Sequence, residues 1–241
     1  MKLGLGIALV NTDSGNRPLS DFSLSDISGL QLWLKNGEGV TAAQWNDSSG
    51  NSNHAAQSTS LRQGTVEDGG IDFNLDDGDH YDLTSTITTS TFTVFVAMEP
   101  DTDGSMTFLS STDSNDFIRI NQTAANEFRT KRADNSLDLI VSHSTDFSFE
   151  GNGGVEKFIV MFRQEGDNTV TIGVNDDLDN FALANSTGSD FNFEVLGSQG
   201  SGGSNSFNGT IYEVAIYNEV LSDSDATLVR NDIADRVGIT I

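Results

Sequence analysis

Apolar and polar residues alternate in many short segments along the chain. Leu30, Leu32 and Leu34 are separated by single intervening residues, and residues 169–175 show the same period of two. This period is typical of β-strands with one buried face. We expect further strands at residues 71–75, 91–98, 106–110, 117–121, 127–132, 137–142, 158–162, 191–196 and 210–218.

Two of these segments, 91–98 and 158–162, are apolar on both faces, which predicts central strands that are covered on both sides. Gly, Asn, Asp and Ser are frequent between the strands, and the chain holds 24 Gly. Many short strands separated by such turns predict an all-β fold of two packed antiparallel sheets. Residues 197–205, rich in Gly and Ser, are expected to form a loop rather than a tether between domains.

One helix is predicted at residues 222–237. Ser222 can cap its start, and Asp225 occupies the third position of a Ser-x-x-Asp capping box. Gly238 is suited to end it. The apolar stripe on one face consists of Ala226, Val229, Ile233 and Val237. We expect this helix to lie on a sheet.

The first 20 residues have their own pattern and are expected to form an N-terminal arm, with residues 21–241 as the main domain. Large side chains alternate with Gly and Ala at the start of the arm, and the large ones are Leu3, Leu5, Ile7 and Leu9. The stretch is short for a signal-peptide core, and no cleavage pattern follows it. The arm could fold back onto its own sheet, or it could add to the sheet edge of a neighbouring protein. We favour the second alternative, with these four residues making the contact.

Three landmarks in the body resemble one known family. They are residues 26–34 with 44–56, then residues 70–73, 80–83 and 92–96, and finally the strand and helix between residues 207 and 237. Together they resemble a concanavalin A-like lectin/glucanase domain of the laminin-G type. The resemblance implies a jelly-roll sandwich of two antiparallel sheets, one of them concave. Members include sugar binders, glycosidases and purely adhesive modules, so the fold alone does not assign a role.

The N-terminal Leu-Gly-Leu-Gly pattern also resembles the openings of tailed-phage virion proteins. That second resemblance covers only a few residues.

The net charge of the chain limits the classes of partner that it is expected to bind. Its 241 residues include 36 acidic and 12 basic ones, for a formal net charge of −24. Such a surface repels nucleic acid and anionic lipid, so we expect neither as a partner. The acidity could serve solubility in a cation-rich medium, or carboxylate-rich loops could hold divalent cations. There is no Cys, and no apolar run approaches the roughly 20 residues that span a bilayer.

Calcium is the only cofactor considered. Two segments concentrate oxygen ligands: Asn74, Asp76, Asp77 and Asp79 in one, and Asp176, Asp177 and Asp179 in the other. Carboxylates on a flexible turn suit calcium, but neither segment has EF-hand spacing. We therefore assign no metal ligand and keep calcium as an open candidate.

No catalytic residue is assigned, and we expect no enzyme. Glycosidases of this fold carry acids on one strand as Glu-x-Asp-x-x-Glu, and no such run exists here. Glu213 and Glu219 are the nearest substitute for a hydrolase. His54 and His80 are expected to be solvated loop residues.

Trp33 and Trp45 could stack on sugars, but their surroundings favour positions in the core. Our prediction from the sequence is a non-enzymatic protein of the virion surface, either a capsid decoration or a tail-associated protein, that packs against other virion proteins. The alternative is a carbohydrate-binding lectin domain, with or without calcium, whose partners are cell-surface glycans. Either could form homo-oligomers.

Overall fold

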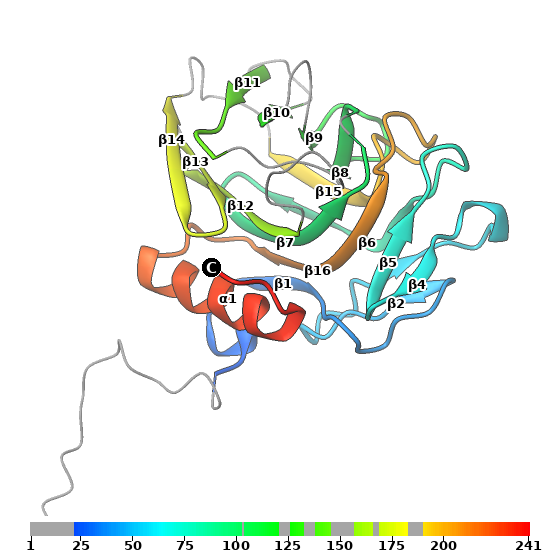
Figure 1. Ribbon diagram of the computed structural model, residues 1–241, viewed down its shortest axis with the longest axis horizontal. Coiled ribbons are helices and arrows are strands. Elements are labelled where there is room, and N and C mark those ends of the chain that lie inside the picture. The colour runs from blue at the N-terminus through cyan, green and yellow to red at the C-terminus, as the bar shows by residue number, and fades with distance from the viewer. Residues whose placement is uncertain are drawn as a thin grey trace, which may run out of the picture.

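The computed structural model describes residues 22–102, 104–120, 126–132, 138–145, 157–165, 169–182 and 190–241. Over these residues, two antiparallel sheets stack face to face, and one helix lies against the first sheet (Figure 1). The predicted all-β, two-sheet fold with a C-terminal helix is confirmed. The arm of residues 1–20, with its four proposed contact residues, lies outside the described residues.

The first sheet, sheet A, has eight strands. In order they are β14 (Asp177–Ala182), β13 (Thr169–Val174), β12 (Phe158–Glu165), β7 (Phe92–Pro100), β16 (Gly209–Tyr217), β5 (Gly70–Phe73) and β4 (Thr65–Glu67), and β1 (Leu30–Leu34) also pairs with β16. Strand β16 is therefore bordered by β7 on one side and by β5 and β1 on the other.

The second sheet, sheet B, also has eight strands. In order they are β11 (Asp138–Ser142), β10 (Glu127–Lys131), β9 (Phe117–Ile120), β8 (Met106–Ser110), β15 (Phe191–Leu196), β6 (Tyr81–Thr89), β3 (Ala55–Ala56) and β2 (Gln44–Trp45). Short 3₁₀ helices, η2 (Leu24–Asp26) and η3 (Ser60–Arg62), lie in the connections. Strands β6, β14, β2, β3 and β4 are not among the strands predicted from the sequence pattern.

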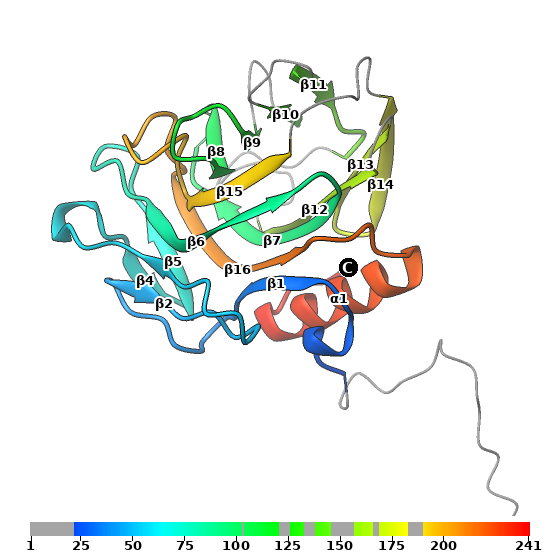
Figure 2. The same ribbon diagram turned by 180° about the vertical axis from the view of Figure 1, so that it is seen from behind.

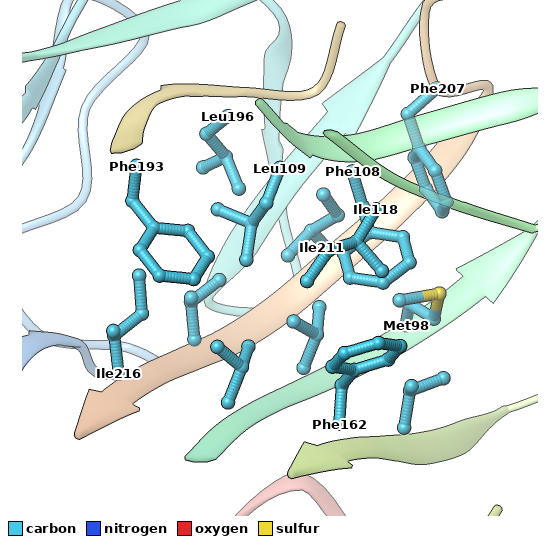
Figure 3. Close-up of a cluster of buried hydrophobic side chains, with 14 of the residues drawn as sticks. Met98, Phe108, Leu109, Ile118, Phe162, Phe193, Leu196, Phe207, Ile211 and Ile216 are labelled. Carbon is cyan, nitrogen blue, oxygen red and sulfur yellow. The ribbon is translucent and has the colours of Figure 1, made fainter. Parts of the chain in front are cut away.

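The main hydrophobic core lies between the two sheets. Sheet A contributes Met98, Phe162, Ile211 and Ile216, and sheet B contributes Phe108, Leu109, Ile118, Phe193 and Leu196, all pointing into the shared layer (Figure 3). Every one of these side chains is fully buried. Because strand side chains alternate between faces, alternate positions supply most of this core. Phe108 and Leu109 are consecutive and both belong to it, at a point where the register between β8 and β9 shifts. Trp45 belongs to the same core, as expected.

A second core lies on the opposite face of sheet A, beneath helix α1 (Asp223–Val237). The predicted stripe of the helix packs there against Phe95, Ala215 and Trp33. The start of the helix is capped as expected, with the Asp225 amide donating to Oγ of Ser222 over 3.1 Å. Within the described ranges, no helix combines the length and apolar character that a membrane crossing requires.

Because of these two cores, the two sheets differ in how their outward faces are covered. The central strands of sheet A, β7, β12 and β16, are buried between sheet B and α1. Within the part of the chain that the structure describes, no helix lies over the face of sheet B that points away from sheet A (Figure 2). We call this second surface the outer face of sheet B. Its residues belong to neither hydrophobic core.

Candidate functional site

The outer face of sheet B carries polar side chains from six strands. Alternation with the core residues directs the following outward: Thr86, Thr88, Thr107, Phe117, Arg119, Arg129, Lys131, Asp138, Ile140, Asn192 and Glu194. Hydroxyl, amide, carboxylate and guanidinium groups are thus combined on one surface. Such a set can both donate to and accept from the hydroxyls of a ligand.

In the half of this face formed by β6 and β15, Glu194 accepts several hydrogen bonds from neighbouring residues. Its Oε1 accepts from Oγ1 of Thr86 over 2.7 Å, and its Oε2 accepts from the amide and hydroxyl of Thr112, each over 2.8 Å. Burial opposes ionisation, but these hydrogen bonds outweigh it and lower the pKa of Glu194. Beside it, Oγ1 of Thr88 donates to Oδ1 of Asn192 over 2.8 Å.

On β9 and β10, the other half of the face contains a cationic cluster, which we define as Arg119, Arg129 and Lys131. The antiparallel register places Arg129 opposite Arg119 and Lys131 opposite Phe117. The guanidinium carbons of Arg119 and Arg129 lie 4.5 and 5.3 Å from the centroid of the Phe117 ring. Both guanidinium groups therefore lie within cation–π distance of the same aromatic ring, which attracts them electrostatically.

Neighbouring polar groups orient the two guanidiniums. Nε and Nη2 of Arg129 donate to the two oxygens of Asp138, each over 2.8 Å, and this pairing lowers the pKa of Asp138. Nε of Arg119 donates to Oγ1 of Thr107 over 3.0 Å, and its Nη2 donates to Gln199. Desolvation, with repulsion from Arg129, lowers the pKa of Arg119 to about 10.

The predicted loop 197–205 borders the outer face and is tied to it. The Ser110 hydroxyl donates to the carbonyl of Ser198 over 2.7 Å and accepts from the amide of Gly200 over 2.9 Å. Ser201 donates its hydroxyl to Asp82 over 2.7 Å. Hydrogen bonds to β8 and β6 therefore fix this Gly/Ser-rich segment against the sheet.

Glu213 and Glu219, the substitute acids for a hydrolase, occupy different environments. Glu213 is fully buried, and it accepts hydrogen bonds from Trp33 and Arg236. Glu219 is exposed and accepts from the hydroxyl of Ser28 over 3.0 Å. Glu213 therefore joins β1, β16 and α1 beneath the helix and is not open to a substrate.

The two acidic segments do not converge as metal sites. Among the described residues, no three His, Cys, Asp or Glu side chains gather as they would around an ion. Asp79 is buried and accepts from the amide of Asn74 over 2.9 Å. Asp177 and Asp179 lie in strand β14, which corrects their expected place in a turn. Their pattern is too rich in Asp to predict a strand from propensity.

His80 also differs from its prediction. It is 3% exposed, and its Nδ1 lies 2.9 Å from the carbonyl oxygen of Gly78, so it is not a solvated loop residue. His54 is half-buried, and its Nδ1 accepts from the amide of Asp47 over 3.0 Å. Trp33 is 6% exposed and lies in the second core, as expected.

The motif at residues 45–54, which carries part of the family resemblance, has a structural role. The carboxylate of Asp47 accepts from the amides of Trp33, Ser49 and Asn53, each over 2.9 Å, and from the Ser49 hydroxyl over 2.8 Å. Asp47 thereby fastens this loop to β1. None of these groups contributes to the outer face of sheet B.

The residues of the outer face were not predicted to form a site from the sequence. Arg119, Arg129 and Lys131 occupy the polar positions of predicted strands, which is the usual signature of a solvated face. One signal was present in the sequence, a spacing of two residues that separates Phe117 from Arg119 on β9 and Arg129 from Lys131 on β10. Their convergence depends on the register between strands, which no single segment encodes.

No protein-family model matches the chain, and no curated protein sequence matches it. Solved structures do. The sialidase of Trypanosoma rangeli matches with a TM-score of 0.58 at 11% identity, over 89% of this chain and 34% of that one. The binding domain of botulinum neurotoxin DC, solved in complex with SialylT, has a TM-score of 0.59 and 17% identity, over 88% of this chain and 52% of that one.

Domain 4 of AbnA, an extracellular arabinanase of Geobacillus stearothermophilus solved with arabinotriose, has a TM-score of 0.57 and 16% identity. The match covers 86% of this chain and 98% of that one. The chain thus spans about a third of the sialidase and nearly all of the arabinanase domain. At such low identities these matches show the fold alone, which is a β-sandwich of the jelly-roll type.

Proposed function

We propose that the chain is a non-catalytic carbohydrate-binding module that holds glycans on the outer face of sheet B. The observation that carries this proposal is the inequality of the two sheets. The centre of sheet A is covered by α1 over an apolar core, while the outer face of sheet B is lined with hydrogen-bonding groups. Sugar hydroxyls require paired donors and acceptors of this kind.

Two structural neighbours support the proposal. The neurotoxin binding domain was solved with SialylT and the arabinanase domain with arabinotriose, so sandwiches of similar architecture in those proteins hold saccharides. The arabinanase domain matches this chain over nearly its whole length, so a domain of this size and fold can bind a glycan.

We also propose that the chain does not hydrolyse the glycans that it binds. Glycoside hydrolysis requires two carboxyl groups that flank the scissile bond. Glu213 is sealed beneath α1 and held by Arg236, so it cannot serve as one of them. Release of reducing sugar during incubation with a bound glycan would contradict this part of the proposal.

A glycan array tests the binding face directly. Thr86→Tyr places a bulky ring on β6 at an exposed position of the outer face and should abolish or greatly weaken binding. Thr65→Tyr is the matched control, because Thr65 is an exposed strand residue on β4 of sheet A. An array that stays silent for the wild-type protein, or equal losses in both variants, would refute the assignment. Repeating the array with calcium and with chelator tests the cofactor.

We also propose that the module works on a virion surface, with residues 1–20 as its anchor. The geometry that favours this is the position of η2, where Leu24 packs beneath α1 and accepts a 3.1 Å hydrogen bond from the Tyr217 hydroxyl. The chain therefore enters the body on the side opposite the outer face of sheet B (Figure 1). An anchor there leaves the glycan-binding face pointing away from the particle.

Deleting residues 1–12 tests the anchor. The truncated protein should keep its β-rich circular dichroism spectrum and its glycan binding but lose incorporation into particles. Incorporation at the wild-type level would rule out the anchor without affecting the glycan-binding proposal.

A further inference from the structure

We propose that strand β14 is a docking edge for residues 3–9 of a second copy of this chain, which add to sheet A as an extra strand. This inference rests on the proposed role of residues 1–20 as an anchor. It names the partner of that anchor, which is another copy of the same protein. The glycan-binding part of the proposed function does not depend on it.

Strand β14 is the outermost strand of sheet A at one end of the molecule (Figures 1 and 2). Among the described residues it pairs only with β13, in a hairpin that Val174 and Asp177 close. In such a hairpin, pairs that exchange hydrogen bonds alternate with pairs that do not. The backbone groups of Leu178, Asn180 and Ala182 therefore point away from β13, and all three residues are exposed. They can pair with an added strand.

The other sheet edges are less suited to strand addition. Strands β2 and β4 have two and three residues. The loop around Asp47 covers the free side of β1, because Asp47 accepts from the amide of Trp33 and the Trp33 carbonyl accepts from the amide of Ser48. Strand β11 has five residues, so β14, with six, is the longest edge strand among the described residues. Long exposed edges are the ones that pair with other chains.

Three apolar side chains on this side of the sandwich are only partly covered. Phe181 of β14 and Leu139 and Val141 of β11 pack against the main core but are half-buried. Strands β11 and β14 lie on the same side, because the amide of Ser144, just after β11, donates to Asp179 over 2.6 Å. A strand added to β14 with large side chains facing inward would cover this end of the core and remove apolar surface from water.

Residues 3–9 have the pattern that this edge calls for. Along a strand, one face would carry the large side chains and the other the small ones, which are Leu3, Leu5, Ile7 and Leu9 against Gly4, Gly6 and Ala8. The large face suits the half-buried side chains of the core. The small face leaves room for Leu178, which is 39% exposed and points to the opposite side of β14 from Phe181.

Charge favours the same pairing. Residues 1–10 include Lys2 and no acidic residue, in a chain whose net charge is −24. Strand β14 carries Asp177 and Asp179. Aspartates on an edge strand disfavour pairing with acidic segments and favour a segment that carries a cation. Because β14 belongs to sheet A, docking there leaves the outer face of sheet B free for glycans.

Sedimentation velocity of the full chain at increasing concentration tests the inference. Species of two or more copies should form. A chain that stays monomeric up to about 1 mM would overturn it, including the case in which residues 3–9 dock on β14 of their own chain. Loss of particle incorporation on deleting residues 1–12 would then still support the anchor, and the glycan array would still decide the binding face.

Asn180→Pro blocks the edge. Proline is tolerated on edge strands and removes the N–H that points away from β13, so self-association should weaken at least about tenfold. Asn180→Ala keeps that N–H, loses only the hydrogen bond from Thr171, and should associate like the wild type. Val66→Pro is the matched control, because Val66 is exposed on β4 and its N–H likewise points away from β5. Equal association in all variants, or equal losses in both proline variants, would overturn the inference.

Variants of the docking segment give an independent test that leaves β14 unchanged. Leu5→Asp combined with Ile7→Asp puts charge on the large face and should abolish self-association. Thr12→Asp combined with Ser14→Asp adds the same charge outside residues 3–9 and should have no effect. Circular dichroism checks that each variant is folded.

Mixing the two kinds of disrupted protein is the sharpest experiment. Copies with Asn180→Pro keep the docking segment, and copies with Leu5→Asp and Ile7→Asp keep the edge. Each should be monomeric alone, and an equal mixture should form dimers and nothing larger, because only one docking contact is then possible. A mixture that stays monomeric would overturn the inference.

Discussion

The indole Nε1 of Trp33 donates a 2.7 Å hydrogen bond to Oε1 of Glu213, and the two residues are 180 positions apart in the sequence. On the same carboxylate, Oε2 accepts from Nε of Arg236 over 2.9 Å. Burial raises the pKa of Glu213, while the hydrogen bonds from Arg236 and Trp33 act in the opposite direction. This single carboxylate therefore connects β1, β16 and α1 inside the second core.

Arg236→Met should destabilise the protein by about 3 kcal/mol, because it leaves the Glu213 carboxylate buried without its cation. Urea denaturation followed by circular dichroism measures this loss. The double variant Glu213→Gln with Arg236→Met should recover much of it, since no buried charge is then left unpaired. Additive losses in the double variant would show that the two side chains do not interact energetically.

Asp47→Ala should lower stability by about 2–3 kcal/mol, because the amides and hydroxyl that Asp47 accepts from lose their partner. Asp47→Asn keeps one accepting oxygen and should cost about half as much. Thermal unfolding measures both effects. Asp76→Ala is the control, because Asp76 is exposed on a loop and should change stability by less than about 0.5 kcal/mol.

Asp72→Asn should raise the Tm at pH 7 and have no effect near pH 3. Desolvation, with repulsion from Asp101 and Glu67, raises the pKa of Asp72 in the folded protein. A raised pKa means that the native state holds the proton more tightly, so ionised Asp72 opposes folding once the pH exceeds its unfolded value of about 4. Melting curves between pH 3 and pH 7 should show the gain growing as the pH rises through the folded pKa.

Asp138→Asn should show the opposite dependence on pH. The hydrogen bonds from Arg129 lower the pKa of Asp138, so its stabilisation is present above the unfolded pKa and lost as the pH falls through the folded one. The variant should be less stable at pH 7, by under about 1 kcal/mol because the pair is exposed, and equal to wild type in strong acid. The same sign of change in both variants would contradict these assignments.

Gly209→Ala should destabilise the protein by about 2 kcal/mol or more. Gly209 has a φ of +125°, and a Cβ there would lie 2.2 Å from the carbonyl oxygen of Glu99 on β7. Gly202→Ala is the matched control, because nothing lies within 4 Å of the added carbon. Equal unfolding free energies for the two variants would show that β16 and β7 are not packed this tightly.

The sequence pattern predicted those strands that have one consistently apolar face. Strands β8 and β15 have the predicted bounds, because Phe191 and Phe193 alternate with polar residues and residues 106–110 are bounded by turns. Strand β6 was missed because the threonines of residues 84–89 give it no clear period, although its first residues belong to the family resemblance. Strand β14 was missed because its aspartates are typical of turns.

The candidate site was harder to predict than the fold. Each member of the cationic cluster is an ordinary polar residue within its own strand. The pairing of β9 with β10 brings Arg119 and Arg129 together, and the register of that pairing is a property of the assembled sheet. The folded structure was therefore needed to identify this surface.

Strand β16 follows every one of its partners in the sequence, yet it lies among β7, β5 and β1 in sheet A. During synthesis, those three strands must leave the ribosome long before the strand that joins them arrives. Contacts between segments so distant form slowly, because a long loop has to close first. Folding of sheet A therefore cannot finish until residues 209–217 have emerged, and a nascent chain halted earlier would expose apolar strands to aggregation and to chaperones.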